Sequence, residues 1–449
     1  MPSLVVAMAR NLPCMQRVLK MSRKRILLVL VAFSMLSLLL HQTSHLHWYP
    51  KILYYQCAAT AGAPKHTAIA FLKTHKTAST TVQNILFRFA EKHNVTVALP
   101  HHSCDHQFCY PRNFSARFVH PYTLPPRIIT NHMRFNASEL RRLMPNDTLY
   151  VTILREPVAM FESLFSYYNQ YCLSFKRVPN GSMETFLNHP LRYHRPNEKF
   201  SMYAHNTLVY DLGGDNDRGN GIAGEAYMNG FIREMEDIFS LVMIAEYFDE
   251  SLILLKHLLS WDLEDMVYVK LNMRTKESKL NITSSLPGKI RAWNSLDSQL
   301  YNHFNATFWK KIREVGAGCV EKEVRLLRQA QEKLMHTCFG DRLRLRSAMQ
   351  IKNKDLRPWQ PSSKVNIIGY DLPGNLSSNP PEHCLKLVMP EIQYSRYLLK
   401  KQTLKNRRKG VQRQPPRPMV KAVVPVQQGV AVVHPVQVNP IRHRPAAAQ

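Results

Sequence analysis

Acidic residues are scarce in this chain of 449 residues, in which 32 Asp and Glu stand against 60 Lys and Arg, a formal net charge of +28. An excess of that size favours polyanionic partners such as nucleic acids, acidic glycans, phosphorylated nucleotides or a membrane surface. Hydrophobic residues make up 45% of the chain and charged residues 20%. These ordinary proportions exclude both a wholly disordered chain and a polytopic membrane protein.

The two ends of the chain lack acidic residues altogether. Residues 1–25 carry several basic residues and no Asp or Glu, and no acidic residue follows Glu391. Seven prolines lie between Pro415 and Pro445 without any helical period, which predicts a disordered basic tail over residues 400–449. Because much of the positive charge sits in these ends, net charge does not argue for a nucleic-acid-binding protein, and we expect no nucleic-acid partner.

The candidate membrane segment is short. A span needs roughly 20 apolar residues, and the run Ile26–Leu40 reaches that length only with its weakly polar flank toward Trp48. No small-x-small cleavage site follows it, so we predict an uncleaved signal-anchor over residues 26–45. Basic residues before it keep residues 1–25 in the cytosol and place the rest in the lumen. A short span suits the thin membranes of the ER or early Golgi.

Glycosylation motifs are absent before this segment and frequent after it, which indicates a lumenal body in the secretory pathway. Residues 46–65 are then a stem. The eight N-x-[ST] motifs begin at Asn94, Asn113, Asn136, Asn146, Asn180, Asn281, Asn305 and Asn375.

Seven of the eight cysteines follow the predicted span. An oxidising lumen favours disulfides, and the odd number leaves one cysteine free or pairing between chains. Cys104 and Cys109 bracket a short loop and are the best candidates for a local disulfide. The alternative is a zinc site that these two residues share with His101, His102 and His106.

Internal repeats are absent, and residues 66–399 are predicted to form one lumenal domain. Short β-rich runs alternate there with amphipathic stretches, which predicts an α/β protein with a central parallel sheet. The expected strands are Thr67–Leu72, Arg127–Asn131, Leu149–Leu154, Leu241–Ala245 and Val267–Leu271. The expected helices are Thr80–Lys92, Pro157–Gln170, Asp249–Leu259 and two long stretches within Lys289–Leu334.

Glycine is missing from the most informative segment, residues 71–81, so this is not a Walker A loop. A buried strand is predicted to end near Leu72, a loop rich in small hydroxyl residues follows, and a helix begins near Thr80. That arrangement aims backbone N–H groups and the positive end of a helix at one point, which makes an anion site. Lys76 adds a mobile charge, and Thr80 and Thr81 add hydroxyls.

A second strand–turn–helix supports the first. The predicted strand over residues 149–154 leads into Arg155, and Ser163 follows eight residues later. Pro157 suits the first turn of a helix. An arginine at the carboxyl end of a strand lies where open α/β sheets bind ligands, and its guanidinium matches a phosphate.

Here the chain resembles a known family. Residues 72–81 resemble the 5′-phosphosulfate loop of sulfotransferases that use PAPS (3′-phosphoadenylyl sulfate), and Arg155 to Ser163 resembles their 3′-phosphate motif. The stretches 71–78, 131–135 and 246–252 are similar to the galactose 3-O-sulfotransferases of the Golgi, and the similarity covers residues 66 to 400.

The resemblance implies a P-loop-like three-layer fold and sulfation of carbon 3 of a terminal β-galactose, on N-acetyllactosamine-type glycans of glycoproteins. No metal is expected. The PAPS site is then formed by Lys73, Thr74, Lys76, Thr77, Ala78, Ser79, Thr80, Thr81, Arg155 and Ser163.

Three residues are the candidate catalytic groups. Lys76 would neutralise the sulfonate and the leaving oxygen, because sulfuryl transfer is an in-line displacement in which the protein positions groups and stabilises charge. His132 is the predicted base, since an imidazole is matched to proton transfer near neutral pH. His75 is the alternative base, although its place in the loop suggests that it positions other groups. Lys73 is either a second cation or a solvated side chain.

Two further points stay open. The triplet Asp215–Asp217 could bind Mn²⁺ and a sugar diphosphate, which gives the alternative of a type II Golgi glycosyltransferase. A Gly/Asn/Asp-rich stretch is first of all a turn, however. The face of a bound galactose should meet an aromatic ring, for which Tyr167, Tyr171 and Trp261 are available without a choice among them.

Overall fold

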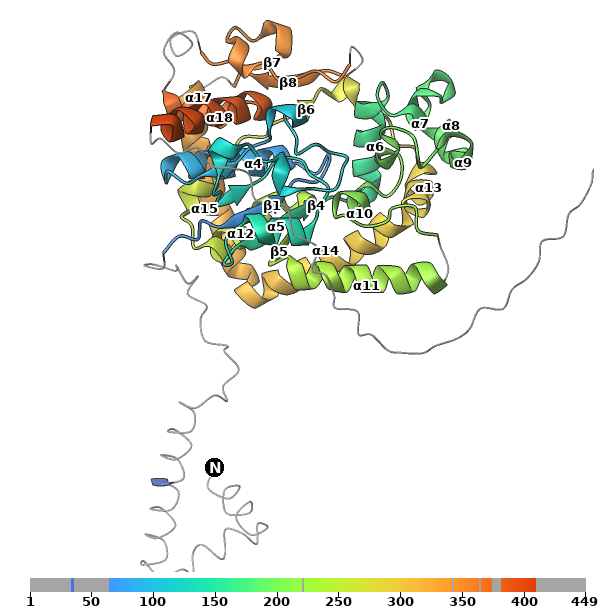
Figure 1. The fold of residues 1–449 in the computed structure, drawn as a ribbon, viewed down its shortest axis with the longest axis horizontal. Coiled ribbons are helices and arrows are strands. Elements are labelled where there is room, and N and C mark those ends of the chain that lie inside the picture. Colours follow the sequence, from blue (N-terminus) through green and yellow to red (C-terminus); the bar gives the residue numbers. More distant parts are fainter. Residues whose placement is uncertain are drawn as a thin grey trace, which may run out of the picture.

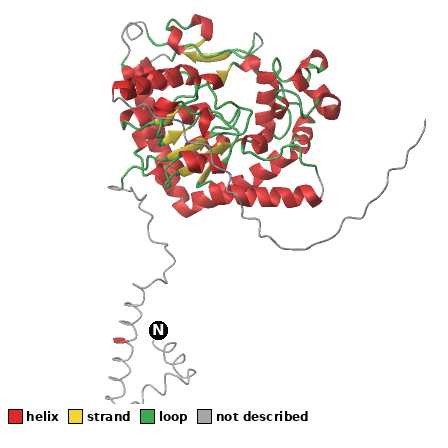
Figure 2. Ribbon diagram, viewed as in Figure 1, coloured by secondary structure: helices red, strands yellow, loops and turns green. Residues whose placement is uncertain are grey.

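The computed structural model describes residues 34–35, 64–219, 222–340, 343–362, 365–373 and 381–408. At its centre lies a parallel sheet of five strands in the order β2-β3-β1-β4-β5, surrounded by helices (Figures 1 and 2). This confirms the predicted α/β class with a central parallel sheet. The strands are β1 (Ile69–Leu72), β2 (Val97–Ala98), β3 (Ile128–Ile129), β4 (Leu149–Leu154) and β5 (Leu241–Ile244).

Four of the five predicted strands are confirmed, and the fifth is wrong. Residues 267–271 form no strand, because their backbone groups bond to side chains of other segments instead of a neighbouring strand. The carbonyl of Val267 accepts a hydrogen bond from Arg88, and the Leu271 N–H donates to Thr81 Oγ1 at 3.2 Å. The fifth strand is instead β2, which pairs with β3 and is too short to show a pattern in the sequence.

The helices follow the predicted alternation, and α4, α6, α12, α14 and α15 correspond to the five that the sequence predicts. β1 is buried along its whole length, as expected of a parallel strand covered on both faces. The helices are α4 (Ser79–Lys92), α5 (Ala137–Leu143), α6 (Pro157–Tyr168), α7 (Leu173–Lys176), α8 (Met183–Asn188), α9 (Pro190–Tyr193), α10 (Thr207–Asp211), α11 (Ile222–Ile238), α12 (Phe248–Leu259), α13 (Leu286–Trp293), α14 (Ser295–Val315), α15 (Ala317–Phe339), α17 (Glu382–Val388) and α18 (Glu391–Arg408).

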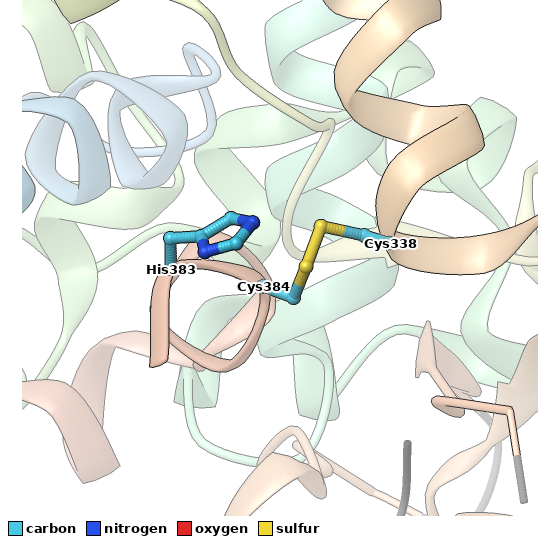
Figure 3. A group of neighbouring side chains, drawn as sticks. All are labelled: Cys338, His383 and Cys384. Carbon is cyan, nitrogen blue, oxygen red and sulfur yellow. A yellow bond between two sulfur atoms is a disulfide. The ribbon is translucent and has the colours of Figure 1, made fainter. Parts of the chain in front are cut away.

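A small second sheet lies beside α17 and α18, at the top of Figure 1. Its antiparallel strands, in the order β6-β8-β7, are β6 (Met273–Arg274), β8 (Ile367–Tyr370) and β7 (Leu345–Ser347). A disulfide between Cys338 of α15 and Cys384 of α17 joins the helices below it, and Figure 3 shows His383 beside that disulfide. The covalent link closes a loop of the chain that includes β7 and β8, which constrains its unfolded state.

Two of the predicted segment boundaries can be compared with the structure. Helix α18 continues past residue 399, the predicted end of the lumenal domain, to Arg408. Of the predicted span over residues 26–45, only Ser34 and Met35 are described, and the described residues include no helix with the length and apolarity to cross a bilayer. The predicted stem and most of the predicted tail lie outside the described residues.

Candidate active site

A cavity of about 1090 Å³ opens at the carboxyl edge of the parallel sheet. Residues that follow four different strands line it, among them Lys76 after β1, His132 after β3, Arg155 after β4 and Glu246 after β5. Because the carboxyl ends of parallel strands meet at one edge, residues far apart in the sequence converge there. Both strand–turn–helix motifs of the sequence therefore contribute to one site.

The loop between β1 and α4 adopts a conformation that glycine favours, although it contains no glycine. The φ angles of Lys76 and Ala78 are 58° and 65°, in the left-handed region. Such backbone conformations cost free energy and cluster at functional sites. Ala78 is also the N-cap of α4, and no side chain caps it. The N–H groups of the first turn of a helix have no partner within the helix, so this end of α4 can bind an anion.

The small hydroxyl residues shape this loop from within. The hydroxyl oxygens of Thr74 and Thr77 lie 2.8 Å apart, and Ser79 Oγ donates to the Thr74 carbonyl at 2.7 Å. Thr80 Oγ1 donates to Glu391 at 2.8 Å. The His75 N–H donates to Asp211 and the Thr81 N–H to the Ala78 carbonyl. The groups of this loop that remain to hold an anion therefore include the N–H groups of residues 76–80 and the Lys76 side chain.

Lys76 and Arg155 form the positive centre of the cavity. Arg155 Nη1 donates to the Lys76 carbonyl at 2.9 Å, and Lys76 Nζ lies 3.7 Å from the centre of the Tyr167 ring. Burial, together with the nearby Arg274 and Arg155, lowers the pKa of the Lys76 ammonium to about 7. Ser163 is buried and lines the same cavity. An anionic ligand would relieve the repulsion between these cations.

Lys73 lies behind the loop and does not line the main cavity. Its side chain is 2% exposed and forms an ion pair with Glu391 of α18. Burial alone would raise the pKa of Glu391, but Lys73 and the Thr80 hydroxyl hold it below its ordinary value. No sequence pattern marks Glu391 as a partner of a lysine more than 300 residues away. The pair joins the last helix of the described chain to the phosphate loop.

The two candidate bases lie against each other. The imidazole rings of His75 and His132 are stacked, with centroids 4.0 Å apart and planes inclined by 9°. His132 Nδ1 lies 2.8 Å from the Lys73 carbonyl, which can only accept, so this nitrogen carries the proton. In the neutral ring Nε2 then has the free lone pair. Burial, with the nearby His75 and Lys73, lowers the pKa of His132 well below its ordinary value and keeps the ring neutral.

Asp211 of α10 orients His75. Its carboxylate lies 2.9 Å from His75 Nδ1 and accepts from the His75 backbone N–H at 2.8 Å. The Tyr110 hydroxyl donates to the same carboxylate at 2.7 Å. Asp211 is fully buried, and His75 Nε2 is buried without a hydrogen-bond partner among the described residues. This is the arrangement of a base oriented by a carboxylate, which the sequence did not reveal because Asp211 and Tyr110 belong to no recognisable motif.

Two of the three aromatic candidates lie at the cavity. Tyr167 and Tyr171 line it, whereas Trp261 is buried in the core, where its ring stacks on Phe89 at 3.4 Å. Sequence reasoning missed Tyr203, which lines the cavity as well. Only the tertiary contacts show that Tyr203 belongs to the site.

The disulfide prediction near the site is confirmed. Cys104 and Cys109 are bonded to each other, so their sulfurs do not form the alternative zinc site. Cys104 lines the cavity, and the Phe108 N–H within the loop donates to the His132 carbonyl at 2.8 Å. The disulfide loop therefore holds the segment that carries His132.

Asp215 and Asp217 lie away from the cavity. Asp217 Oδ1 lies 3.2 Å from His194 Nε2 and 2.9 Å from His205 Nδ1. Asp215 Oδ1 accepts from the Asp217 N–H at 3.2 Å, a turn contact. The side chains of His194, His205 and Asp217 lie near enough to one another to hold a metal ion. None of them lines the cavity that the phosphate loop forms, so the glycosyltransferase alternative finds no support.

Comparisons with known proteins agree with this geometry. The sequence model of a family described as Galactose-3-O-sulfotransferase matches residues 8–402. The chain is 58% identical to galactose-3-O-sulfotransferase 3 of Mus musculus over 421 residues, which cover 91% of this chain and 96% of that protein. It is 59% identical to galactose-3-O-sulfotransferase 3 of Homo sapiens, over 89% of this chain and 93% of that protein. Galactosylceramide sulfotransferase of Homo sapiens is 41% identical, over 73% of this chain and 76% of that protein.

Proposed function

This chain belongs to the galactose-3-O-sulfotransferase family, and on that premise we propose that it transfers a sulfuryl group from PAPS to the 3-hydroxyl of a terminal β-galactose. The acceptors are N-acetyllactosamine-type glycans of glycoproteins. The chain is a sulfotransferase that acts on galactose, and its family uses a sulfonate donor. The observation that carries the proposal is the single cavity in which Lys76, Arg155 and the stacked imidazoles meet.

The donor side is built on β1 and β4. The uncapped start of α4 and Lys76 would hold the 5′-phosphosulfate, while Arg155 and Ser163 would hold the 3′-phosphate. The fit rests on the left-handed loop at Lys76 and Ala78, on the start of α4, which no side chain caps, and on two cations that repel each other without an anion. PAPS would supply the sulfuryl group. Lys73 would act on the donor only indirectly, by holding the loop against Glu391.

The acceptor side would activate the galactose hydroxyl. His132 Nε2, which has the lone pair, would take the proton of the 3-hydroxyl as its oxygen forms the new bond to sulfur. Lys76 would stabilise the charge that develops on the 5′-phosphate oxygen as the bond from that oxygen to sulfur breaks. His75, held by Asp211, would keep the His132 ring in place and exclude water behind it.

We also propose that the protein is a single-pass type II membrane protein of the Golgi with its catalytic domain in the lumen. Residues 1–25 would lie in the cytosol, residues 26–45 in the membrane and residues 46–65 in the stem, followed by the catalytic domain from residue 66 and the basic tail. Two disulfides support an oxidising compartment. Several asparagines that begin glycosylation motifs are exposed, which supports a lumenal position. They are Asn94, Asn113, Asn146, Asn180 and Asn281.

The test is transfer of ³⁵S from labelled PAPS to N-acetyllactosamine by the full chain, with the position of the label determined by glycosidic and periodate analysis. We expect label on carbon 3 of galactose, and a loss of about 10²- to 10³-fold in turnover for Lys76→Ala. Lys289→Ala is a matched control, because Lys289 lies on α13 and does not line the cavity. Label on another sugar, or none on any galactoside, would contradict the proposal.

A further inference from the structure

Two large aromatic side chains remain exposed at the mouth of the cavity. Trp359 is 48% exposed and Tyr171 is 40% exposed, and both line the cavity. Their ring centroids lie 6.2 Å apart, and the planes are inclined by 33°. Leaving that much apolar surface in water is unfavourable. An exposed aromatic pair beside a binding cavity therefore marks a candidate contact surface.

Hydrogen bonds hold the backbone that follows Trp359. The Gln360 side chain bonds to both backbone groups of Ile367, donating to its carbonyl at 2.9 Å and accepting from its N–H at 2.8 Å. Tyr171 Oη donates to the Pro361 carbonyl at 2.8 Å. The indole N–H of Trp359 has no hydrogen-bond partner among the described residues. These bonds hold the backbone next to Trp359, while its ring, 48% exposed, remains open to a ligand.

The pair lies outward from the point of sulfuryl transfer. Tyr167 separates it from Lys76, since Lys76 Nζ lies over the Tyr167 ring and the Tyr167 and Trp359 centroids are 6.1 Å apart. Tyr168, the next residue of α6, packs edge-on against His75 with centroids 6.2 Å apart. This end of α6 therefore belongs to the acceptor side of the cavity, with Trp359 at its outer rim.

We propose that Trp359 and Tyr171 form a second sugar subsite, which binds the residue to which the terminal galactose is attached. The inference rests on the proposed function. A pyranose presents an apolar face of C–H groups that packs on an aromatic ring, and its hydroxyls can accept from the indole N–H. With the galactose between His132 and Lys76, the next sugar lies toward the mouth, where these rings are exposed. This subsite would make the enzyme prefer extended glycans over simple galactosides.

The test compares two acceptors, methyl β-galactoside and N-acetyllactosamine, with the full chain and Trp359→Ala. We expect kcat/KM for N-acetyllactosamine to fall about tenfold in Trp359→Ala. The value for methyl β-galactoside and the KM for PAPS should stay unchanged. Trp359→Phe, which retains a ring, should lose less. Met349→Ala is the matched control, because Met349 is 81% exposed beside the same small sheet and does not line the cavity.

The other outcomes overturn the inference in different ways. An equal loss on both acceptors would mean that Trp359 supports the galactose site or the fold. A raised KM for PAPS would place the indole on the nucleotide instead. If the wild-type enzyme sulfates neither acceptor, the proposed function itself fails and the subsite fails with it. If it sulfates both, and Trp359→Ala does so with wild-type constants, only the subsite is wrong.

Discussion

The two halves of the active site are built in opposite ways. The donor half consists of the phosphate loop, Arg155 and Ser163, and each part is a short strand–turn–helix segment. The acceptor half consists of His132, Tyr110, Asp211 and the aromatic residues, which come from many segments. In the donor half the chemistry follows from local geometry, because a helix end binds anions wherever it occurs. In the acceptor half it follows from tertiary contacts.

His75 connects the halves. It belongs to the phosphate loop by sequence, yet its side chain bonds to Asp211, 136 residues away, and stacks on His132. The loop backbone thus serves the donor while one of its side chains serves the acceptor. Changes in the acceptor half should therefore reduce turnover and leave donor affinity intact. Changes that only loosen the loop from behind, such as at Glu391, should weaken donor binding more than turnover.

The largest expected effect tests which imidazole is the base. His132→Ala should lower kcat about 10³-fold, because the group that accepts the hydroxyl proton is lost. The Kd for PAPS, measured by calorimetry, should change little. His75→Ala should cost less, since His75 Nε2 is enclosed and His132 is half-buried at the cavity. A greater loss in His75→Ala than in His132→Ala would transfer the role of base to His75.

Asp211→Asn tests whether the orientation of His75 by Asp211 affects the rate of sulfuryl transfer. The amide keeps the size of the side chain but removes the charge that holds His75 Nδ1 and Tyr110. We expect kcat to fall roughly 10- to 100-fold, as is usual for residues that orient a functional ring from behind, with PAPS affinity unchanged. If Asp211 had a purely structural role, the substitution would lower the melting temperature. The kcat of the folded fraction and its pH profile would then stay as in the wild type. Tyr110→Phe keeps the carboxylate and should cost less.

Glu391→Gln tests the donor half in the same way. The substitution leaves the buried Lys73 ammonium without its ionic partner and weakens the link to Thr80. Breaking a buried pair on one side is costly, so the free energy of unfolding should fall by about 2 kcal/mol or more. The KM for PAPS should rise about tenfold while kcat for bound substrates changes less. Arg325→Ala, which breaks an exposed pair with Glu321 on α15, is the control. A loss of kcat with an unchanged KM would remove the distinction between the two halves.

The sequence revealed these halves unequally. The donor loops were predicted because strand ends, hydroxyl-rich turns and Pro157 are local signals, and four of the strands were placed for the same reason. Residues 267–271 were misread as a strand because they alternate between two surroundings without pairing to a strand. Val267 and Val269 are buried in the core, while Tyr268, Lys270 and Leu271 line the cavity. Nothing in the sequence singled out Asp211, and Glu391 was noticed only as the last acidic residue of the chain. Contacts across more than 100 residues leave no periodicity for a sequence to show.

The smallest expected effect is a pH dependence that separates the halves without any change in the fold. The pKa of Lys76 is lowered to about 7, so the ammonium that binds the donor is lost as the pH rises through that value. kcat/KM for PAPS, which reports the free enzyme, should fall about fivefold from pH 7 to pH 8. The acid limb should lie well below pH 6.5, because the pKa of His132 is lowered and the ring stays neutral. Lys76→Arg, always charged, should be slower but lose the alkaline limb. If the alkaline limb persists in Lys76→Arg, another group is responsible for it. The pH dependence of donor binding would then not come from Lys76.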